Sequence, residues 1–209
     1  KKAKDMKLYM VSLWHQLSVN GELQSVKLCH CMDVSSFRFF TRSTINEHMV
    51  FGCRTLSTRV EKGTKQSITL KDVPVIFHIY VRGDGLLCIA VTDNEYPVRV
   101  AFVLIQRSIE EFESRVQGRW KQITKDQTSA DPPFLKALFD EFQNPRADKL
   151  QNIQCQLDDI KGIMHQNIES LIERGESLDS LLEKSTDISN SSKQFYKQAR
   201  KANSCCRSW

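Results

Sequence analysis

Residues 167–181 read Asn-Ile-Glu-Ser-Leu-Ile-Glu-Arg-Gly-Glu-Ser-Leu-Asp-Ser-Leu, and they lie within a heptad pattern that runs from Leu150 to Ala202. Alternate steps of three and four residues give sixteen seam positions, of which twelve are apolar. A seam this narrow packs against other helices rather than against the face of a domain. The pattern predicts a left-handed coiled-coil helix of roughly 80 Å, at 1.5 Å per residue. The seam positions are Leu150, Ile153, Leu157, Ile160, Met164, Asn167, Leu171, Arg174, Leu178, Leu181, Ser185, Ile188, Ser192, Phe195, Ala199 and Ala202.

Arg174 is the one charged residue of this seam. A charge there is costly unless partner helices satisfy it, and the five donors of a guanidinium suit a ring of side-chain carbonyls such as those of glutamines. A polar seam residue also fixes register and helix number. From periodicity alone, the alternative is an arginine whose charged end reaches out of a two-stranded coil to solvent.

The seam lacks its own partner, because the chain contains only one such helix. Gly162 and Gly175 each cost about 1 kcal/mol of helix stability relative to alanine. Ser185 and Ser192 weaken the seam further. We therefore expect the isolated segment to be largely unfolded and to order when it binds.

The composition excludes several classes of protein. The chain has 209 residues, 40% of them apolar and 26% charged, which suits one compact domain with an extended element, or two small domains. A net charge of +5, dispersed along the chain, does not indicate nucleic-acid binding. No run approaches the roughly 18 to 20 apolar residues of a membrane span, and seven scattered cysteines argue against a disulfide framework. We expect a reduced cytosolic protein.

The part of the chain before the heptads predicts an α+β domain that ends near residue 143. The turns Asn20-Gly21 and Gly83-Asp84-Gly85 join predicted strands, and Ser35 or Ser36 is positioned to cap the first helix. The polar stretch 118–133 predicts a loop. Together the elements indicate a five-stranded antiparallel sheet with helices on its faces. The predicted strands are 7–17, 24–34, 66–73, 75–82 and 86–92, and the predicted helices are 37–56, 97–116 and 134–142.

No motif of the chain indicates catalysis, a cofactor or a metal site. In Cys29-His30-Cys31 the alternation of a strand puts His30 on the opposite face from the two thiols, and no second pair stands at zinc-finger spacing. The five histidines form no local catalytic motif. Gly83-Asp84-Gly85 lacks the Gly-Lys that a phosphate loop requires. We expect a protein that is not an enzyme and that needs no cofactor.

The C-terminal residues suggest a lipid anchor. A cysteine fourth from the end, Cys206, stands at the prenylation position, and Cys205 with nearby basic residues supplies the second signal that stable anchoring needs. We expect prenyl on Cys206 and palmitoyl on Cys205. The ending Arg207-Ser208-Trp209 is unusual for this role, so the alternative is a pair of unmodified cysteines or an altered C-terminus.

These residues together resemble an R-SNARE with an N-terminal longin domain. Arg174 matches the ionic central layer of the R-SNARE motif and Asn167 the polar layer two before it, with seven layers before Arg174 and eight after it. The domain before it resembles the profilin-like longin module, and the whole chain is similar to the lipid-anchored R-SNAREs of the Ykt-six type, which lack a transmembrane helix. The resemblance fails in the loop 118–133 and at the last three residues. It is carried by Met6-Lys7-Leu8-Tyr9, Asp33-Val34-Ser35-Ser36-Phe37, Phe39-Phe40, Arg42-Ser43, Glu95-Tyr96-Pro97-Val98-Arg99-Val100-Ala101-Phe102, Glu173-Arg174-Gly175-Glu176 and Asn203-Ser204-Cys205-Cys206.

The resemblance implies a division of the chain and a set of partners. Residues 1–5 would be a leader or an artificial extension, 6–143 the longin domain, 146–204 the SNARE motif and 205–209 the lipidation tail. The motif would give one helix to a four-helix bundle with Qa, Qb and Qc SNARE helices, and so drive membrane fusion in vesicle transport. The protein would be cytoplasmic and also peripheral on the cytosolic face of Golgi, ER and endosomal or vacuolar membranes.

The resemblance also implies a closed form, in which the longin domain folds back on its own SNARE motif. Phe51 matches a position that lines the groove for that motif, although an ordinary core phenylalanine is the alternative. A competing function is a non-fusogenic longin regulator whose helix blocks SNARE assembly. Such a regulator would need neither Arg174 nor a lipid anchor.

Overall fold

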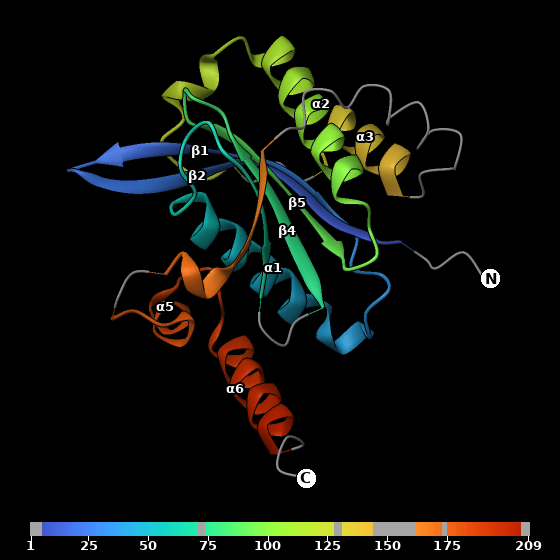
Figure 1. The fold of residues 1–209 in the computed structure, drawn as a ribbon, viewed down its shortest axis with the longest axis vertical. Helices are drawn as coiled ribbons and strands as arrows, with labels where there is room; N and C mark the ends of the chain where they lie inside the picture. The colour runs from blue at the N-terminus through green and yellow to red at the C-terminus, as the bar shows by residue number, and fades with distance from the viewer. Residues whose placement is uncertain (1–5, 71–73, 128–130, 144–161, 173–174, 206–209) are drawn as a thin grey trace.

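In the computed structural model, a six-stranded sheet forms the centre of the described part of the chain, which comprises residues 6–70, 74–127, 131–143, 162–172 and 175–205 (Figure 1). The strand order is β2-β1-β5-β4-β3-β6. Neighbouring strands are antiparallel except β6, which runs parallel to β3. The strands are β1 (Leu8–Val19), β2 (Glu22–Met32), β3 (Lys65–Thr69), β4 (Val75–Val81), β5 (Leu86–Asp93) and β6 (Ile163–Asn167).

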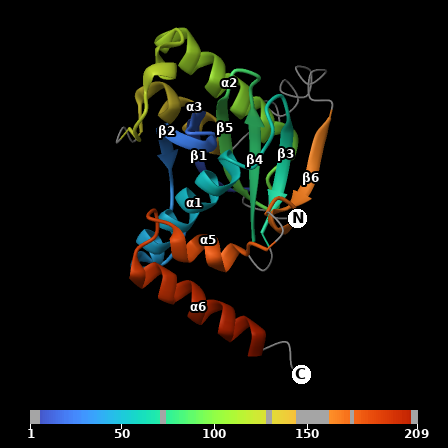
Figure 2. The ribbon, with the colours of Figure 1, turned by 90° about the vertical axis from the view of Figure 1, so that its left-hand side faces the viewer.

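Helices cover both faces of this sheet (Figures 1 and 2). On one face lie α2 (Val98–Val116) and α3 (Pro133–Gln143), and on the other lies α1 (Arg42–Ser57). The sequence of β5 explains why both faces are covered, because every residue of its run 86–91 is apolar. Residues at even positions of this run pack toward α2, and residues at odd positions pack toward α1. The predicted α+β class is confirmed.

The helix α1 lies unusually close to the sheet. An ideal Cβ atom built on Gly52 would stand 2.8 Å from Cζ of Phe77 on β4, so a larger residue here would require the Phe77 ring to shift. Phe51 and Arg54 lie close to Gly52 in the sequence, and both contact the C-terminal part of the chain, where Phe51 packs on Leu182 and Arg54 binds Asp187. The inner face of α1 is thus fixed on the sheet, and its outer face is presented to the C-terminal part of the chain.

Two expectations for the domain are corrected. The helix α1 begins at Arg42 and not at residue 37, because a 3₁₀ turn, η1 (Phe39–Thr41), precedes it. The backbone N–H of Ser35 donates to Oδ1 of Asp33 at 2.8 Å, so this stretch closes a turn of its own and caps no helix. Within the predicted loop 118–133, a second 3₁₀ turn, η2 (Arg119–Gln122), buries Trp120 in the core.

The C-terminal segment differs most from expectation, since it is not one continuous helix. Its described residues form β6, the 3₁₀ turn η4 (Ile168–Ser170), α5 (Leu178–Lys184) and α6 (Asn190–Cys205). Gly162 and Gly175 adopt φ values of +87° and +97°, which end any helix that reaches them. Strand β6 is also the reason that the sheet has six strands where five were predicted. Residues 146–161 of the predicted helix lie outside the described residues.

In the described ranges, no helix is both long enough and apolar enough to cross a bilayer.

Candidate functional site

The described residues from 162 onward, here called the C-terminal segment, fold back along the outside of the domain (Figures 1 and 2). Strand β6 lies at the edge of the sheet, α5 crosses beside α1, and α6 extends away from the domain. The contacts between this segment and the domain form the candidate site, because they involve the residues predicted to form the coiled-coil seam.

Strand β6 holds the beginning of the segment on β3. Its register pairs Lys65 with Ile163 at one end and Thr69 with Asn167 at the other. Asn167 then caps η4, since its side-chain oxygen accepts from the N–H of Glu169 at 3.2 Å. The next residue, Ile168, is 1% exposed and packs into the core between α1 and the sheet. The segment is therefore held at this end by a backbone ladder and by one fully buried side chain.

An apolar cluster joins α5 to the outer face of α1. Phe51, Leu182 and Ile188 are each less than 8% exposed, and they pack with the half-buried Leu178 and Leu181 of the same segment. Phe51 is the only fully buried member that the domain supplies. Burial of a leucine, isoleucine or phenylalanine side chain stabilises by about 1.5 to 3 kcal/mol, so this cluster helps to hold the segment on the domain.

The first turns of α6 pack on the first turns of α1. Ser192 is 1% exposed, and its hydroxyl donates to Oγ1 of Thr44 at 3.3 Å. The backbone N–H of Ser189 donates to Oε2 of Glu47 at 2.8 Å. Burial alone raises the pKa of the Glu47 carboxyl, but hydrogen bonds from Ser189 outweigh burial and lower it. The carboxylate of Glu47 thus acts as a charged cap for the start of α6.

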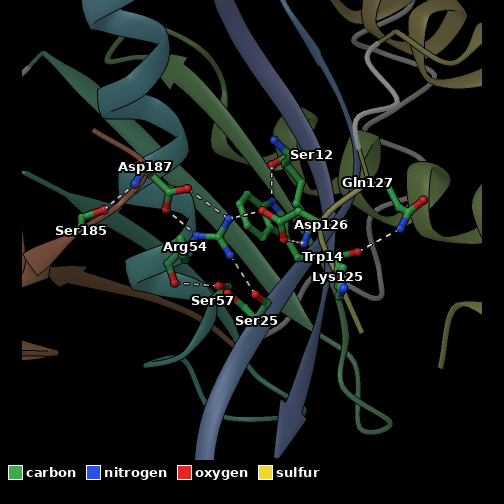
Figure 3. A network of polar contacts seen from close by, with 11 residues as sticks. Ser12, Trp14, Ser25, Arg54, Ser57, Lys125, Asp126, Gln127, Ser185 and Asp187 are labelled. Carbon is green, nitrogen blue, oxygen red and sulfur yellow. Dashed lines mark hydrogen bonds and ion pairs between the residues drawn. The ribbon is translucent and has the colours of Figure 1, made fainter. Parts of the chain in front are cut away.

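Arg54 is the polar centre of the contact (Figure 3). Its Nε donates to Oδ2 of Asp187 at 2.5 Å and its Nη2 to Oδ1 at 3.2 Å, a bidentate pair with the segment. Its other donors bind the carbonyl of Ser25 at 2.9 Å and the carboxylate of Asp126, and its guanidinium lies 5.0 Å from the ring of Trp14. Burial by itself lowers the pKa of Arg54, yet the bonds to Asp187 and Asp126 raise it overall. One side chain therefore ties together α1, β2, the loop after η2 and the C-terminal segment.

A second ion pair lies just after the end of α1. Nη2 of Arg59 donates to Oε2 of Glu176 at 3.0 Å, and its Nη1 donates to the carbonyl of Thr55 at 3.2 Å. Glu176 directly precedes Ser177, which caps α5 by accepting from the N–H of Ser180. Arg54 of α1 and Arg59, which follows α1, thus bind residues on either side of α5.

The predicted seam positions whose side chains are described differ in how far they are buried. Ile188 and Ser192 are buried; Leu171, Leu178, Leu181 and Ser185 are half-buried; Met164 and Phe195 are 40% and 43% exposed, and Asn167 is exposed. Ala199, Ala202 and Cys205 lie on α6, in a part where only the backbone is described. Leu150, Ile153, Leu157, Ile160, Arg174 and Cys206 lie outside the described residues.

Several residues of the contact carried no signal in the sequence. Ile168 and Leu182 each follow a seam position by one residue, so the heptad pattern assigned them to flanking positions. Arg54 and Asp187 are 133 residues apart and belong to no local motif. Their pairing depends on the tertiary fold, and only a search for complementary charges across a known fold would have found it.

Two family models divide the chain between them. Residues 34–145 match the Longin model, described as a regulated-SNARE-like domain, and residues 149–207 match the Synaptobrevin model. The curated relatives include "Synaptobrevin homolog YKT6" of Debaryomyces hansenii, 40% identical over 96% of this chain and 98% of that protein. The proteins of that name from Yarrowia lipolytica and Saccharomyces cerevisiae are 37% and 34% identical over the same shares. The chain belongs to the YKT6 branch of the synaptobrevin family.

As a YKT6-family protein with both domains, the chain is an R-SNARE of vesicle transport and assembles with other SNAREs. The family consists of membrane-fusion SNAREs and not of enzymes. The resemblance stated from the sequence is therefore confirmed. The candidate site consists of the contacts between a longin-type domain and the C-terminal part of its own synaptobrevin motif.

We predict that Asp187→Asn and Arg54→Gln loosen α5 and the start of α6. Hydrogen bonds to charged groups contribute about 1.5 to 3 kcal/mol, and both side chains are less than one-third exposed. Amide hydrogen exchange in residues 175–192 should become about tenfold faster for each 1.4 kcal/mol lost. Arg107→Gln is the matched control, because it removes an ion pair with Glu141 between α2 and α3. Unchanged exchange in both variants would contradict the role given to Arg54.

Proposed function

We propose that this R-SNARE alternates between the closed form described above and an open form that enters SNARE complexes. In the open form residues 146–204 would be one helix of a parallel four-helix bundle with Qa, Qb and Qc helices. The observation that supports this most directly is the burial of Ile188 and Ser192, which a bundle needs in its seam, against α1 of the same chain. The longin domain would thus autoinhibit the motif.

The two forms exclude one another because the same residues need different backbone geometry. Residues 163–167 are extended in β6, where a strand rises about 3.3 Å per residue. In a helix the rise is about 1.5 Å per residue. Strand β6 must therefore leave β3 before the heptad can continue through it, and α5 must leave Phe51. Assembly and folding back compete for one segment.

Within the bundle we assign Arg174 to the ionic central layer. Its five donors match side-chain carbonyls from three glutamine-bearing helices. The remaining seam positions would form the apolar and small polar layers. These assignments follow from the heptad register of the sequence.

We assign the membrane anchor to prenyl on Cys206 and palmitoyl on Cys205, since two lipid groups hold a protein on a bilayer far more firmly than one. The anchored protein would act on the cytosolic face of Golgi, ER and endosomal or vacuolar membranes. An apolar cavity of about 310 Å³ lies between α1 and the C-terminal segment, lined by Phe37, Met49 and Phe195 among others. Its lining suits an isoprenoid chain, so the closed form would also cover the lipid in water.

We predict that Phe51→Glu opens the protein and accelerates SNARE assembly. The carboxylate would be buried against Leu182 and Ile188 without a partner, which favours release of the segment. Mixed with a set of Q-SNARE helices, the variant should gain helicity faster than the wild type and reach the same heat-resistant complex. Phe40→Glu, at a site that is 93% exposed and lies before α1, is the control. A wild type and variant that both fail to assemble with any Q-SNARE set would support the non-fusogenic regulator instead.

We predict that Arg174→Leu impairs register more than stability. Leucine removes the charge that only one alignment of the four helices satisfies, and it adds apolar contact. Labels at both ends of the bundle should show misaligned complexes by energy transfer, while the melting temperature stays equal or rises. Leu178→Ala should do the reverse, lowering the melting temperature without misalignment. Correct register in every Arg174→Leu complex would refute the layer assignment.

We predict that the C-terminal peptide from cells carries both lipids. Its mass should exceed that of the unmodified peptide by one isoprenoid and one acyl group, and hydroxylamine should remove only the acyl thioester. Cys206→Ser should abolish both additions if prenylation comes first. An unmodified peptide in the membrane fraction would contradict the anchor.

A further inference from the structure

The turn η1 presents two phenylalanine side chains directly to solvent. Phe39 is 74% exposed and Phe40 is 93% exposed, and no other large apolar residue of the described chain exceeds 44%. The two rings contact each other edge to face, with centroids 5.6 Å apart. They form a small apolar tip on a convex turn, which is costly to leave in water.

The turn is rigid, so the rings are held outward. Nη2 of Arg42 donates to the carbonyl of Ser35 at 2.7 Å, and its Nε donates to the carbonyl of Phe37 at 3.1 Å. Thr41 closes the turn by donating to the carbonyl of Arg38 at 2.9 Å. Phe37 anchors the turn by packing on Tyr9, with ring centroids 5.2 Å apart. Folding of this turn therefore fixes the position of Phe39 and Phe40 rather than burying them.

Positive charge surrounds the tip. Arg38 is exposed, and the guanidinium of Arg42 lies 5.8 Å from the ring of Phe39. Neither arginine forms an ion pair with any residue of the described ranges. The nearest carboxylate in the sequence, Asp33, accepts from Ser35 and so belongs to the fold of the turn.

The helix α6 adds to this charge. It contains Lys193, Lys197, Arg200 and Lys201 and no acidic residue, although Lys197 forms an ion pair with Glu183 of α5. The hydrogen bond between Ser192 and Thr44 places its first turns beside the start of α1, just after η1. Figures 1 and 2 show η1, the blue segment that leads into α1, at the end of the domain from which α6 extends.

We propose that η1 is a membrane-docking turn, which inserts Phe39 and Phe40 into the headgroup region of an anionic bilayer while Arg38 and Arg42 contact lipid phosphates. Aromatic rings and basic side chains together are typical of the membrane interface. A protein partner fits less well, because a stable interface buries about 800 Å² per partner and this tip is narrow and convex. The contact needs neither lipid on Cys205 or Cys206 nor release of the segment, so it is independent of the function proposed above.

The test uses the full chain made in bacteria, where the two cysteines carry no lipid. Co-sedimentation with phosphatidylcholine vesicles, with and without phosphatidylserine, measures the partition. The wild type should bind vesicles that contain phosphatidylserine. Phe39→Ser/Phe40→Ser should bind them at least about tenfold more weakly, since it loses two inserted rings, and Arg38→Ser should weaken binding mainly at low salt. Leu23→Ser, which removes the most exposed apolar residue outside the tip, should bind like the wild type.

A second measurement reports insertion directly and does not depend on affinity. Phe40→Trp should gain fluorescence that brominated lipids quench, and Leu23→Trp should not. Equal binding of the wild type and the double serine variant would overturn the proposal, and so would equal quenching of the two tryptophan variants. A wild type that binds neither type of vesicle would overturn it in favour of a protein partner for the two rings. All variants are expected to fold, because the substituted side chains lie on the surface.

Discussion

The structure depends on one constraint: the apolar side chains of a coiled-coil seam must be covered, and the sequence has only one helix with such a seam. In water an isolated seam would expose a row of leucine and isoleucine side chains. In the described structure the segment is not one continuous helix, and the seam residue Ile188 is buried against the domain together with the flanking residues Ile168 and Leu182. The C-terminal elements, from β6 to α6, thus pack against the domain in place of partner helices.

The arrangement is held by contacts of different kinds along its length. Strand β6 is joined to β3 by a backbone ladder, α5 by the apolar cluster around Phe51, and the start of α6 by polar contacts to α1. Arg54 lies where these meet, because it binds Asp187 of the segment and Asp126 of the domain. No single contact needs to be strong for the whole segment to be held. Loss of one contact weakens the others, since each limits the freedom of its neighbours.

The sequence predicted the domain well because its signals are local. Alternating and continuous apolar runs marked β1 to β5, and Asn20-Gly21 marked the first hairpin at a residue with positive φ. The SNARE motif was equally clear, since the heptads and Arg174 are a one-dimensional pattern. The heptad pattern describes the helix that the segment would form with partner SNARE helices, and so it did not predict the strand β6. The Arg54–Asp187 pair was not predicted for a related reason, because residues that meet only in the tertiary fold have no characteristic spacing in the sequence.

Strand β6 has a consequence for the domain as well as for the segment. It covers the edge of β3, where backbone N–H and C=O groups would otherwise lack partners and could template pairing with another chain. In the open form proposed above, the domain would give up this protection. The uncovered strand is only five residues long, and short edge strands are one way in which proteins limit sheet-to-sheet aggregation. The segment and the domain therefore protect each other, and the brevity of β3 reduces the risk to the domain while they are apart.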